Sequence, residues 1–180
     1  MLKPAILYDN EVQKLYTELL TNNYEKYKFT NFNGYVDYKL HISDNEWCNA
    51  AYVSVLNNNT LLGYMALGID RGNNYMHGLF AISFLPDKLN PIFSRDLIEF
   101  IYNMFTNERY SVVNRKIESK VIVGNPAEKM WDKFVIKLGG TIHHYSIKEV
   151  NIDNRYYDVK YYEILKENFK IDYIKQLLDF

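Results

Sequence analysis

The stretch from residue 75 to residue 124 places a helix between two strands, and this order constrains the fold more than any other feature of the chain. The apolar run YMHGLFAISFL, residues 75–85, is typical of a strand. A helix is predicted to start at Asn90 and Pro91, because asparagine is a good N-cap and proline suits the first helical position. The β-branched run SKVIVG, residues 119–124, is typical of a strand buried on both faces. Strands joined through a helix lie parallel by a right-handed crossover, so this unit predicts a mixed sheet.

Two more strands precede this unit. The runs AAYVSVL and LLGYMALGI, residues 50–56 and 61–69, are apolar and bounded by clusters of Asn, Asp and Gly. Because such short turns join antiparallel strands, these two runs and the strand at 75–85 are predicted to form a meander.

The remaining segments complete an alternating order of helices and strands, read from their hydrophobic spacing and their cap residues. Nothing in the chain marks a linker or an internal repeat, so we expect a single domain over residues 1–180. The further predicted elements are a helix at 11–20, a short helix or irregular cover within 22–49, a helix from 125 to 138 that stops at Gly139 and Gly140, a closing hairpin of 141–147 with 156–165 across a polar loop, and a last helix within 171–180.

Composition narrows the functional classes. The net charge of −1 leaves no surplus of Lys and Arg for nucleic acid or for a membrane surface. The start, MLKPAILYDNEV, lacks the long apolar stretch of a signal peptide, so we expect a cytoplasmic protein. Cys48 is the single cysteine, which excludes an internal disulfide and a Cys-based zinc site. Heavy use of Asn, Lys, Ile and Tyr, with 17 Tyr, suggests an AT-rich coding sequence of a low-GC bacterium or its phage.

The order of elements resembles the GCN5-related N-acetyltransferase (GNAT) fold over about residues 50–166. The run VIVGNPAEKMWDKFVIKLGG, residues 121–140, is similar to that family's strand, Asn, helix and Gly ending, and Asp158 in NRYYDVKYYEIL is similar to the usual entry into its last strand. The resemblance implies an α/β fold with a central mixed sheet of about six to seven strands, flanking helices and a parallel pair at strands 4 and 5. It also implies that acetyl-CoA binds where these two strands separate.

The start of the helix at Asn90 departs from the family pattern for binding the CoA pyrophosphate. The family has Gln or Arg, two residues, Gly, one residue, then Gly or Ala, and the matching positions here are Leu89, Ile92 and Ser94. What remains is a helix start with backbone N–H groups at Ile92, Phe93 and Ser94, and two cations, Lys88 and Arg95. Two interpretations stay open, a reduced pyrophosphate site and a plain capped helix.

Other cofactor contacts follow from the resemblance. The backbone of Ser83, Phe84 and Leu85 is expected to hold the pantetheine arm of acetyl-CoA like an added strand. Asn125 has two compatible interpretations, as the cap of its own helix and as a residue lining the pantetheine channel.

The family often uses a Tyr in the helix after this Asn as the acid that protonates the leaving thiolate. Counting along this helix reaches Trp131, Asp132 or Val135 and no Tyr. Tyr145 and Tyr157 are therefore the candidates for that acid.

His77 is the candidate general base, because it lies on the strand expected to border the cofactor site and the neutral form of a histidine suits this task. The alternative is a histidine satisfied on a sheet face. Asp44 and Glu46 are candidates to bind a cationic acceptor, or else form a solvated acidic loop. His143 and His144 are adjacent on a strand and should face opposite sides, so we expect no metal site.

Two functions of different class remain. The first is an N-acyltransferase that uses acetyl-CoA and a small-molecule or peptide amine as acceptor, by direct attack of the amine on the thioester. The second is a GNAT-fold binding or interaction protein without catalysis, which the changed helix start and the missing Tyr favour. By analogy with other proteins of this fold, the closing hairpin suggests a homodimer.

Overall fold

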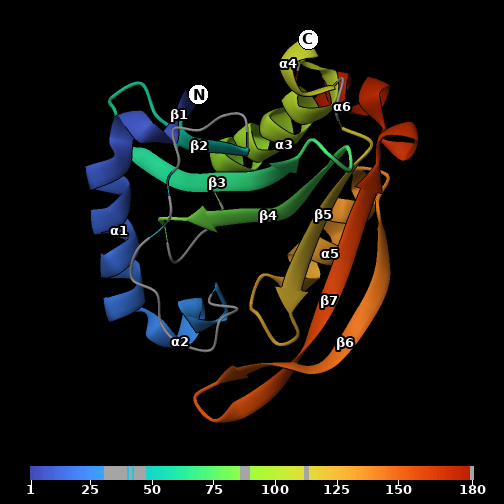
Figure 1. Ribbon diagram of the computed structural model, residues 1–180. Coiled ribbons are helices and arrows are strands. Elements are labelled where there is room, and N and C mark those ends of the chain that lie inside the picture. The colour runs from blue at the N-terminus through green and yellow to red at the C-terminus, as the bar shows by residue number, and fades with distance from the viewer. Residues whose placement is uncertain (31–39, 41, 43–47, 86–89, 112–113, 179–180) are drawn as a thin grey trace.

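The computed structural model describes residues 1–30, 40, 42, 48–85, 90–111 and 114–178. Within them, seven strands form one mixed sheet in the order β1-β2-β3-β4-β5-β7-β6 (Figure 1). The predicted α/β class, with about six to seven strands and a parallel pair, is therefore confirmed. The strands are β1 (Leu2–Pro4), β2 (Asn49–Val55), β3 (Leu61–Asp70), β4 (Tyr75–Ser83), β5 (Lys116–Ile122), β6 (Thr141–Ile152) and β7 (Arg155–Leu165).

Helices cover both faces of the sheet. Within the part of the chain that the structure describes, none is long and apolar enough to cross a membrane. The helices are α1 (Asp9–Asn22), α2 (Tyr24–Tyr27), α3 (Pro91–Thr106), α4 (Glu108–Ser111), α5 (Glu128–Lys137) and α6 (Ile171–Leu178), and the 3-10 helices are η1 (Ala5–Tyr8), η2 (Lys28–Thr30) and η3 (Lys166–Asn168).

Alternation along the strands separates two buried clusters, as expected for a sheet covered on both sides. On one side, Met65 of β3 packs in the cluster that contains Phe100 of α3 and Val135 of α5. On the other side, Tyr64 packs with residues of α1, among them Tyr16. We call these sides the α3 face and the α1 face.

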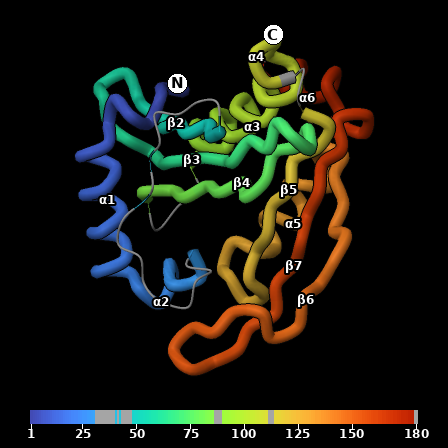
Figure 2. Tube along the Cα trace, viewed as in Figure 1, coloured from blue at the N-terminus to red at the C-terminus, as the bar shows by residue number. Residues whose placement is uncertain are grey.

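The fourth and fifth strands separate almost as soon as they meet. Their parallel ladder contains one register pair, Met76 with Ile117, whereas β5 pairs with β7 over its whole length from Lys116 to Ile122. Figures 1 and 2 show β4 and β5 running in different directions from this point. The carboxyl ends of both strands therefore lie apart, which is the site where open mixed sheets bind ligands.

The predicted boundaries hold in outline, with two changes. The strand β1, which pairs with β2, was not expected from the sequence. The closing hairpin is longer than predicted, because the region expected to be a polar loop is mostly strand and turns tightly at Asp153 and Asn154. Both turn residues have positive φ values, 51° and 61°, as a two-residue hairpin turn requires.

Candidate active site

One edge of β4 faces the space left by β5. The N–H of Phe84 donates to the carbonyl of Leu62 on β3 at 2.9 Å. Because successive residues of a strand direct their backbone polar groups to opposite edges, Ala81 and Ser83 direct theirs toward β5. Among the described residues, no residue of β4 after Met76 has a ladder partner on β5. This edge is therefore open to pair with an extended ligand.

The carbonyl of Ser83 on that edge already has a protein partner. It accepts a hydrogen bond from the hydroxyl of Tyr27 at 3.2 Å. Of the other predicted pantetheine contacts, Phe84 uses its N–H within the sheet, and the N–H of Leu85 is bonded to the hydroxyl of Ser83 at 3.2 Å. The donors and acceptors predicted at 83–85 are thus largely engaged within the protein.

Tyr27 belongs to a strap, residues 24–30, that joins the two separated arms of the sheet, β1 to β4 and β5 to β7. Phe29 of the strap packs with Ile122 of β5 and stacks edge-on with Tyr157 of β7, with ring centroids 5.4 Å apart. At the tip of the β6–β7 hairpin, Asp153 accepts a hydrogen bond from the hydroxyl of Tyr24 at 2.7 Å. The strap therefore spans from the end of β4 to the far hairpin. It also occupies Tyr157, one of the two candidate acids.

The start of α3 uses most of its predicted phosphate donors for itself. The side chain of Asn90 accepts from the N–H of Ile92 at 2.8 Å, and its carbonyl accepts from the N–H of Ser94 at 3.0 Å. The ring of Phe93 is buried, and the guanidinium of Arg95 donates to the carbonyl of Leu178 at 2.9 Å. Lys88 and Leu89 lie outside the described residues, as do Asp44 and Glu46. The geometry at 90–95 is that of the capped helix.

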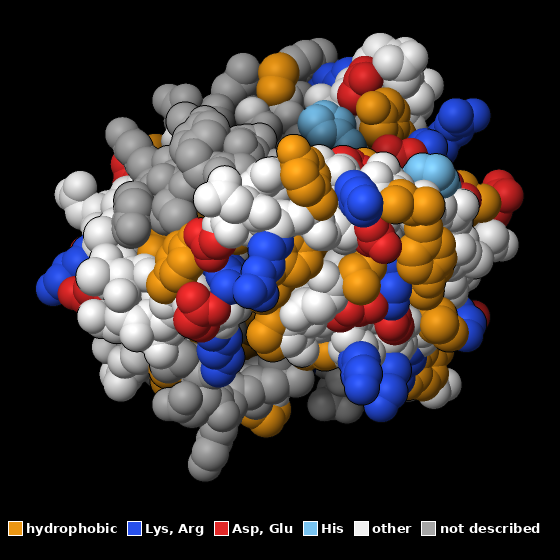
Figure 3. Space-filling view, turned by 90° about the horizontal axis from the view of Figure 1, so that it is seen from below, with side chains coloured by type: hydrophobic (Ala, Val, Ile, Leu, Met, Phe, Trp, Pro, Cys, Tyr) orange, Lys and Arg blue, Asp and Glu red, His pale blue; other side chains and the backbone are white. Residues whose placement is uncertain are grey.

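Charge on the neighbouring surface is mixed. Figure 3 shows the molecule from below, with basic side chains beside acidic ones and hydrophobic side chains between them. Among the residues coloured there, no continuous basic surface is present that could bind the phosphates of a nucleotide.

The turn after β5 is built by short hydrogen bonds. Gly124, at φ +92°, donates its N–H to the carboxylate of Glu128 at 2.8 Å, and the side-chain oxygen of Asn125 accepts from the N–H of Ala127 at 2.8 Å. A residue with a side chain is strained at this positive φ value, which explains why a glycine occupies position 124. The oxygen of Asn125 thus serves the turn before α5, whereas the N-cap position of this helix is Ala127, so Asn125 is not the cap that the sequence predicted.

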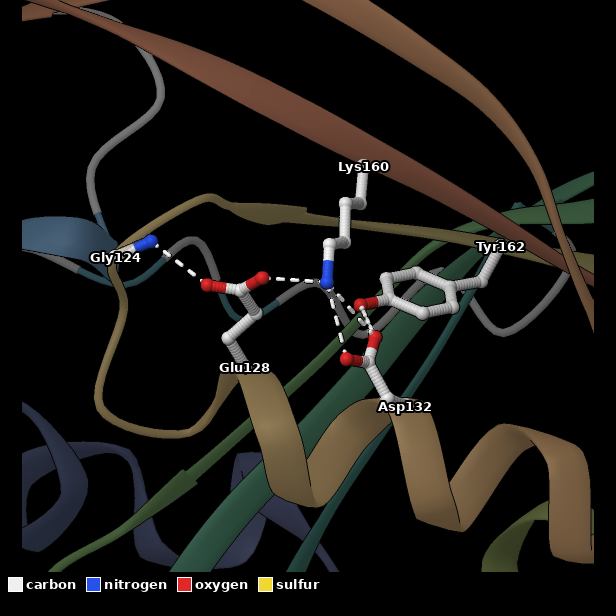
Figure 4. A network of polar contacts seen from close by, with 5 residues as sticks. All are labelled: Gly124, Glu128, Asp132, Lys160 and Tyr162. Carbon is white, nitrogen blue, oxygen red and sulfur yellow. Dashed lines mark hydrogen bonds and ion pairs between the residues drawn. The ribbon is translucent and has the colours of Figure 1, made fainter.

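Lys160 of β7 lies between two carboxylates of α5, Glu128 and Asp132 (Figure 4). Its side chain is only 11% exposed, and its amine is 3.0 Å from the Asp132 carboxylate. The hydroxyl of Tyr162 donates to Asp132 at 2.7 Å. This network fastens the start of α5 to β7 and, through Glu128, holds Gly124 at the end of β5.

The same network decides what its members can do chemically. Burial acts to raise the pKa of Asp132, but the hydrogen bonds from Tyr162 and Lys160 outweigh it and leave the pKa below its ordinary value. Burial, and then the bond to Asp132, raise the pKa of Tyr162. Counting along α5 had reached Asp132 where a Tyr was sought, and the structure places a Tyr hydroxyl there from β7. With a raised pKa, Tyr162 is poorly suited to protonate a thiolate.

The two predicted catalytic residues do not meet. Tyr145 pairs in register with Lys160, whose amine lies 5.9 Å from the centroid of the Tyr145 ring on the side of α5. His77 lies on the α1 face, beside Gly68. The sheet therefore separates them, and Tyr145 cannot act as an acid beside His77.

His77 lines a hollow of about 260 Å³ on the α1 face. It is one residue beyond Met76, where β4 and β5 part, and its imidazole lies across Gly68 of β3. A Cβ atom at Gly68 would come within 2.5 Å of the ring carbon Cε1 and 2.7 Å of Nε2. The residues lining the hollow are Asn49, Ala51, Tyr64, Ala66, Leu67, Gly68, His77 and Gly78.

A bulge in β4 places His77 at this point. Ala66 and Gly68 are two positions apart on β3, but their partners Phe80 and His77 are three apart on β4, and Gly78 between them has φ +64°. Such an extra residue bends a strand and redirects its side chains. The sequence did not identify this hollow, although the small residues at alternating positions 66 and 68 were its visible signal.

The two neighbouring histidines of β6 do not face opposite sides, and that expectation is wrong. A register shift between Ile142 and His144 brings the rings of His143 and His144 to centroid distances of 6.2 and 5.5 Å from the ring of Tyr161. Among the described residues, no group of three or more His, Cys, Asp or Glu could hold a metal ion.

The strand order, the crossover helix and the separated β4 and β5 define the GNAT fold, so the resemblance seen in the sequence is confirmed at the level of the fold. A spermidine N-acetyltransferase from Vibrio cholerae, solved in complex with CoA and spermine, matches with TM-score 0.69 and 22% identity over 93% of this chain and 96% of that chain. A probable acetyltransferase matches with TM-score 0.68 and 14% identity over 89% and 91%.

A dodecameric form of the Vibrio cholerae enzyme matches less of the chain, with TM-score 0.55 and 26% identity over 71% of this chain and 69% of that chain. Neither a protein-family model nor a curated protein sequence matches the chain. The comparisons therefore establish the fold.

Proposed function

We propose that this protein is an N-acyltransferase that moves an acetyl group from acetyl-CoA to an amine. One observation carries the proposal. β4 leaves β5 directly after Met76, so the later part of β4 has a backbone edge without a ladder partner on β5, and His77, the residue after Met76, lines the hollow on the α1 face. A spermidine N-acetyltransferase and a probable acetyltransferase share this fold, and the former was solved with CoA, which supports the choice of acyl donor.

The residues present fit the pantetheine arm better than the phosphates. The amide groups of pantetheine can pair with Ala81 as an added strand would, and with the carbonyl of Ser83 where they displace the hydroxyl of Tyr27. The cap at the start of α3 has its N–H groups at 92 and 94 engaged, so the pyrophosphate gains little there. We therefore expect acetyl-CoA to bind with an affinity dominated by the pantetheine arm.

The reaction needs one base at the amine. The amine nitrogen attacks the thioester carbonyl, the new C–N bond forms, and the C–S bond breaks with its electron pair leaving on sulfur. His77, directly or through water, takes the proton that the ammonium group gives up. Of the two predicted acids, Tyr145 lies on the other side of the sheet and Tyr157 packs against Phe29, so we assign protonation of the thiolate to solvent.

The first test is calorimetric titration with acetyl-CoA and with free CoA. Proline at position 81 removes the N–H that Ala81 directs toward the opening without removing a β3 bond, so Ala81→Pro should weaken binding of both ligands several-fold. The melting temperature of the variant shows whether it stays folded. Binding by the wild type that Ala81→Pro leaves unchanged would show that CoA does not use this edge.

A second function has its own support, because the capped α3 start favours a GNAT-fold binding protein without catalysis. Absence of binding at millimolar acetyl-CoA, by calorimetry and by melting temperature, would select it over the enzyme. The predicted homodimer stays a prediction; light scattering of the purified protein measures it directly.

A further inference from the structure

The hollow beside His77 has a flat floor. Ala51 and Ala66 are ladder partners on β2 and β3, as are Asn49 and Gly68. Ala51, Ala66 and Gly68 therefore form a strip across two strands in which no side chain is larger than a methyl group. A sheet surface without protruding side chains favours a ligand that is itself flat.

The walls of the hollow carry aromatic rings. Tyr64 is buried, at 2% exposure, and its ring tilts against Phe80 with centroids 6.2 Å apart. Burial raises the pKa of Tyr64 to about 12, so its phenol is neutral at any physiological pH. On the other side, the imidazole of His77 lies across Gly68. A ring entering the hollow would meet one aromatic edge and one imidazole.

The charge of the hollow is as informative as its shape. None of the described residues that line it is acidic. Of the acidic side chains nearby along the strands, Glu118 pairs with Lys116, and Asp70 stays a carboxylate whose pKa is lowered by hydrogen bonds from Asn73 and by His77. One ammonium group at His77 therefore has Asp70 near it, but further ammonium groups along the hollow would be desolvated without a described counter-ion, which is costly.

From these observations we infer that the acceptor is a monoamine whose single amino group is carried on a flat apolar ring, with the ring on the Ala51–Ala66–Gly68 floor and the nitrogen at His77. The inference rests on the proposed acyl transfer. It separates this protein from its structural relative solved with spermine, because a polyamine would bring further ammonium groups to a hollow whose described lining offers no carboxylate.

The test compares amines in the presence of acetyl-CoA by the release of free thiol. 2-Phenylethylamine should give a kcat/KM at least tenfold above that of spermidine. Ala51→Leu places a branched side chain on the floor, and it should lower kcat/KM for 2-phenylethylamine about tenfold. Thr141→Leu, on the edge strand β6, places a leucine outside the hollow and should leave this kcat/KM unchanged.

A second measurement keeps the inference separate from the acyl transfer itself. Calorimetric titration of 2-phenylethylamine, without any acyl donor, should show binding that Ala51→Leu weakens and Thr141→Leu does not. If acetyl-CoA fails to bind, the proposed function falls, but this titration still decides whether the hollow takes an aryl amine. Preference for spermidine, equal binding by the Ala51→Leu variant, or no amine binding by a protein that binds acetyl-CoA would each overturn the inference.

Discussion

The hydroxyl of Tyr27 donates to the carbonyl of Ser83 at 3.2 Å, on the one edge of β4 that β5 leaves unpaired. A side chain from the strap at 24–30 thus takes an acceptor that a pantetheine amide would need. The strap reaches the other arm as well, through Phe29 at Ile122. A bound pantetheine amide and the hydroxyl of Tyr27 would therefore compete for the carbonyl oxygen of Ser83.

This competition predicts a gain of affinity on removal of the hydroxyl. Tyr27→Phe keeps the ring but frees the Ser83 carbonyl, so CoA should bind about two to ten times more tightly, the value of one neutral hydrogen bond of about 0.5–1.5 kcal/mol. Calorimetry measures the change, and Tyr24→Phe, which removes the hydroxyl bound to Asp153 instead, is the matched control. Unchanged or weaker binding by Tyr27→Phe would show that the ligand does not use Ser83.

The glycine under His77 predicts a positioning effect. A methyl group in Gly68→Ala would overlap the imidazole, so His77 must move and the acetyl transfer rate should fall at least tenfold with a shifted pH profile. Gly72→Ala is the control, because its new methyl group would meet only ordinary van der Waals contact with Asp70. If Gly68→Ala and Gly72→Ala have equal kcat and equal pH profiles, His77 is not the base.

Replacement of Lys160 should lower the stability of the protein, whereas replacement of an exposed lysine should not. In Lys160→Met, the partly exposed carboxylates of Glu128 and Asp132 keep their charges but lose their shared hydrogen-bond donor, and the free energy of unfolding should fall by about 1–3 kcal/mol. Denaturant titration measures it, with Lys133→Met on the exposed side of α5 as control. Equal stability of the two variants would mean that the network contributes nothing to the attachment of α5.

The carboxylates predict how stability changes in acid. Burial opposes the charge on Asp132 and on Glu149, but hydrogen bonds from Tyr162 and Lys160, and from Tyr161, leave both pKa values below the ordinary 3.8 and 4.5. Their contribution is complete above those ordinary values and is lost as pH falls through the lowered ones. Stability should therefore decline below about pH 4.5, and less steeply in Asp132→Asn than in Asp172→Asn. The same slope in both variants would show that Asp132 is not held in its charged form.

Much of this architecture could be predicted from local sequence. The cap at Asn90 and Pro91, the crossover to the strand near residue 119 and the glycine stop after α5 are encoded within a few residues of where they act. Hydrophobic periodicity then assigns each element its buried face. These features determined the order of the elements, the parallel pair and the GNAT fold.

Contacts between distant parts of the chain were decided only by the tertiary structure. Tyr27 and Ser83 are 56 residues apart, and the Tyr162 hydroxyl reaches Asp132 across 30 residues. The extra residue at Gly78 turns His77 onto Gly68, and a register shift brings His143 and His144 to one side. Gly78, at positive φ, is a local signal for a bulge, but the strand periodicity does not show which side chains the bulge redirects. Whether β4 and β5 pair along their length or part after one residue depends on how the two halves of the sheet pack, and that separation creates the site.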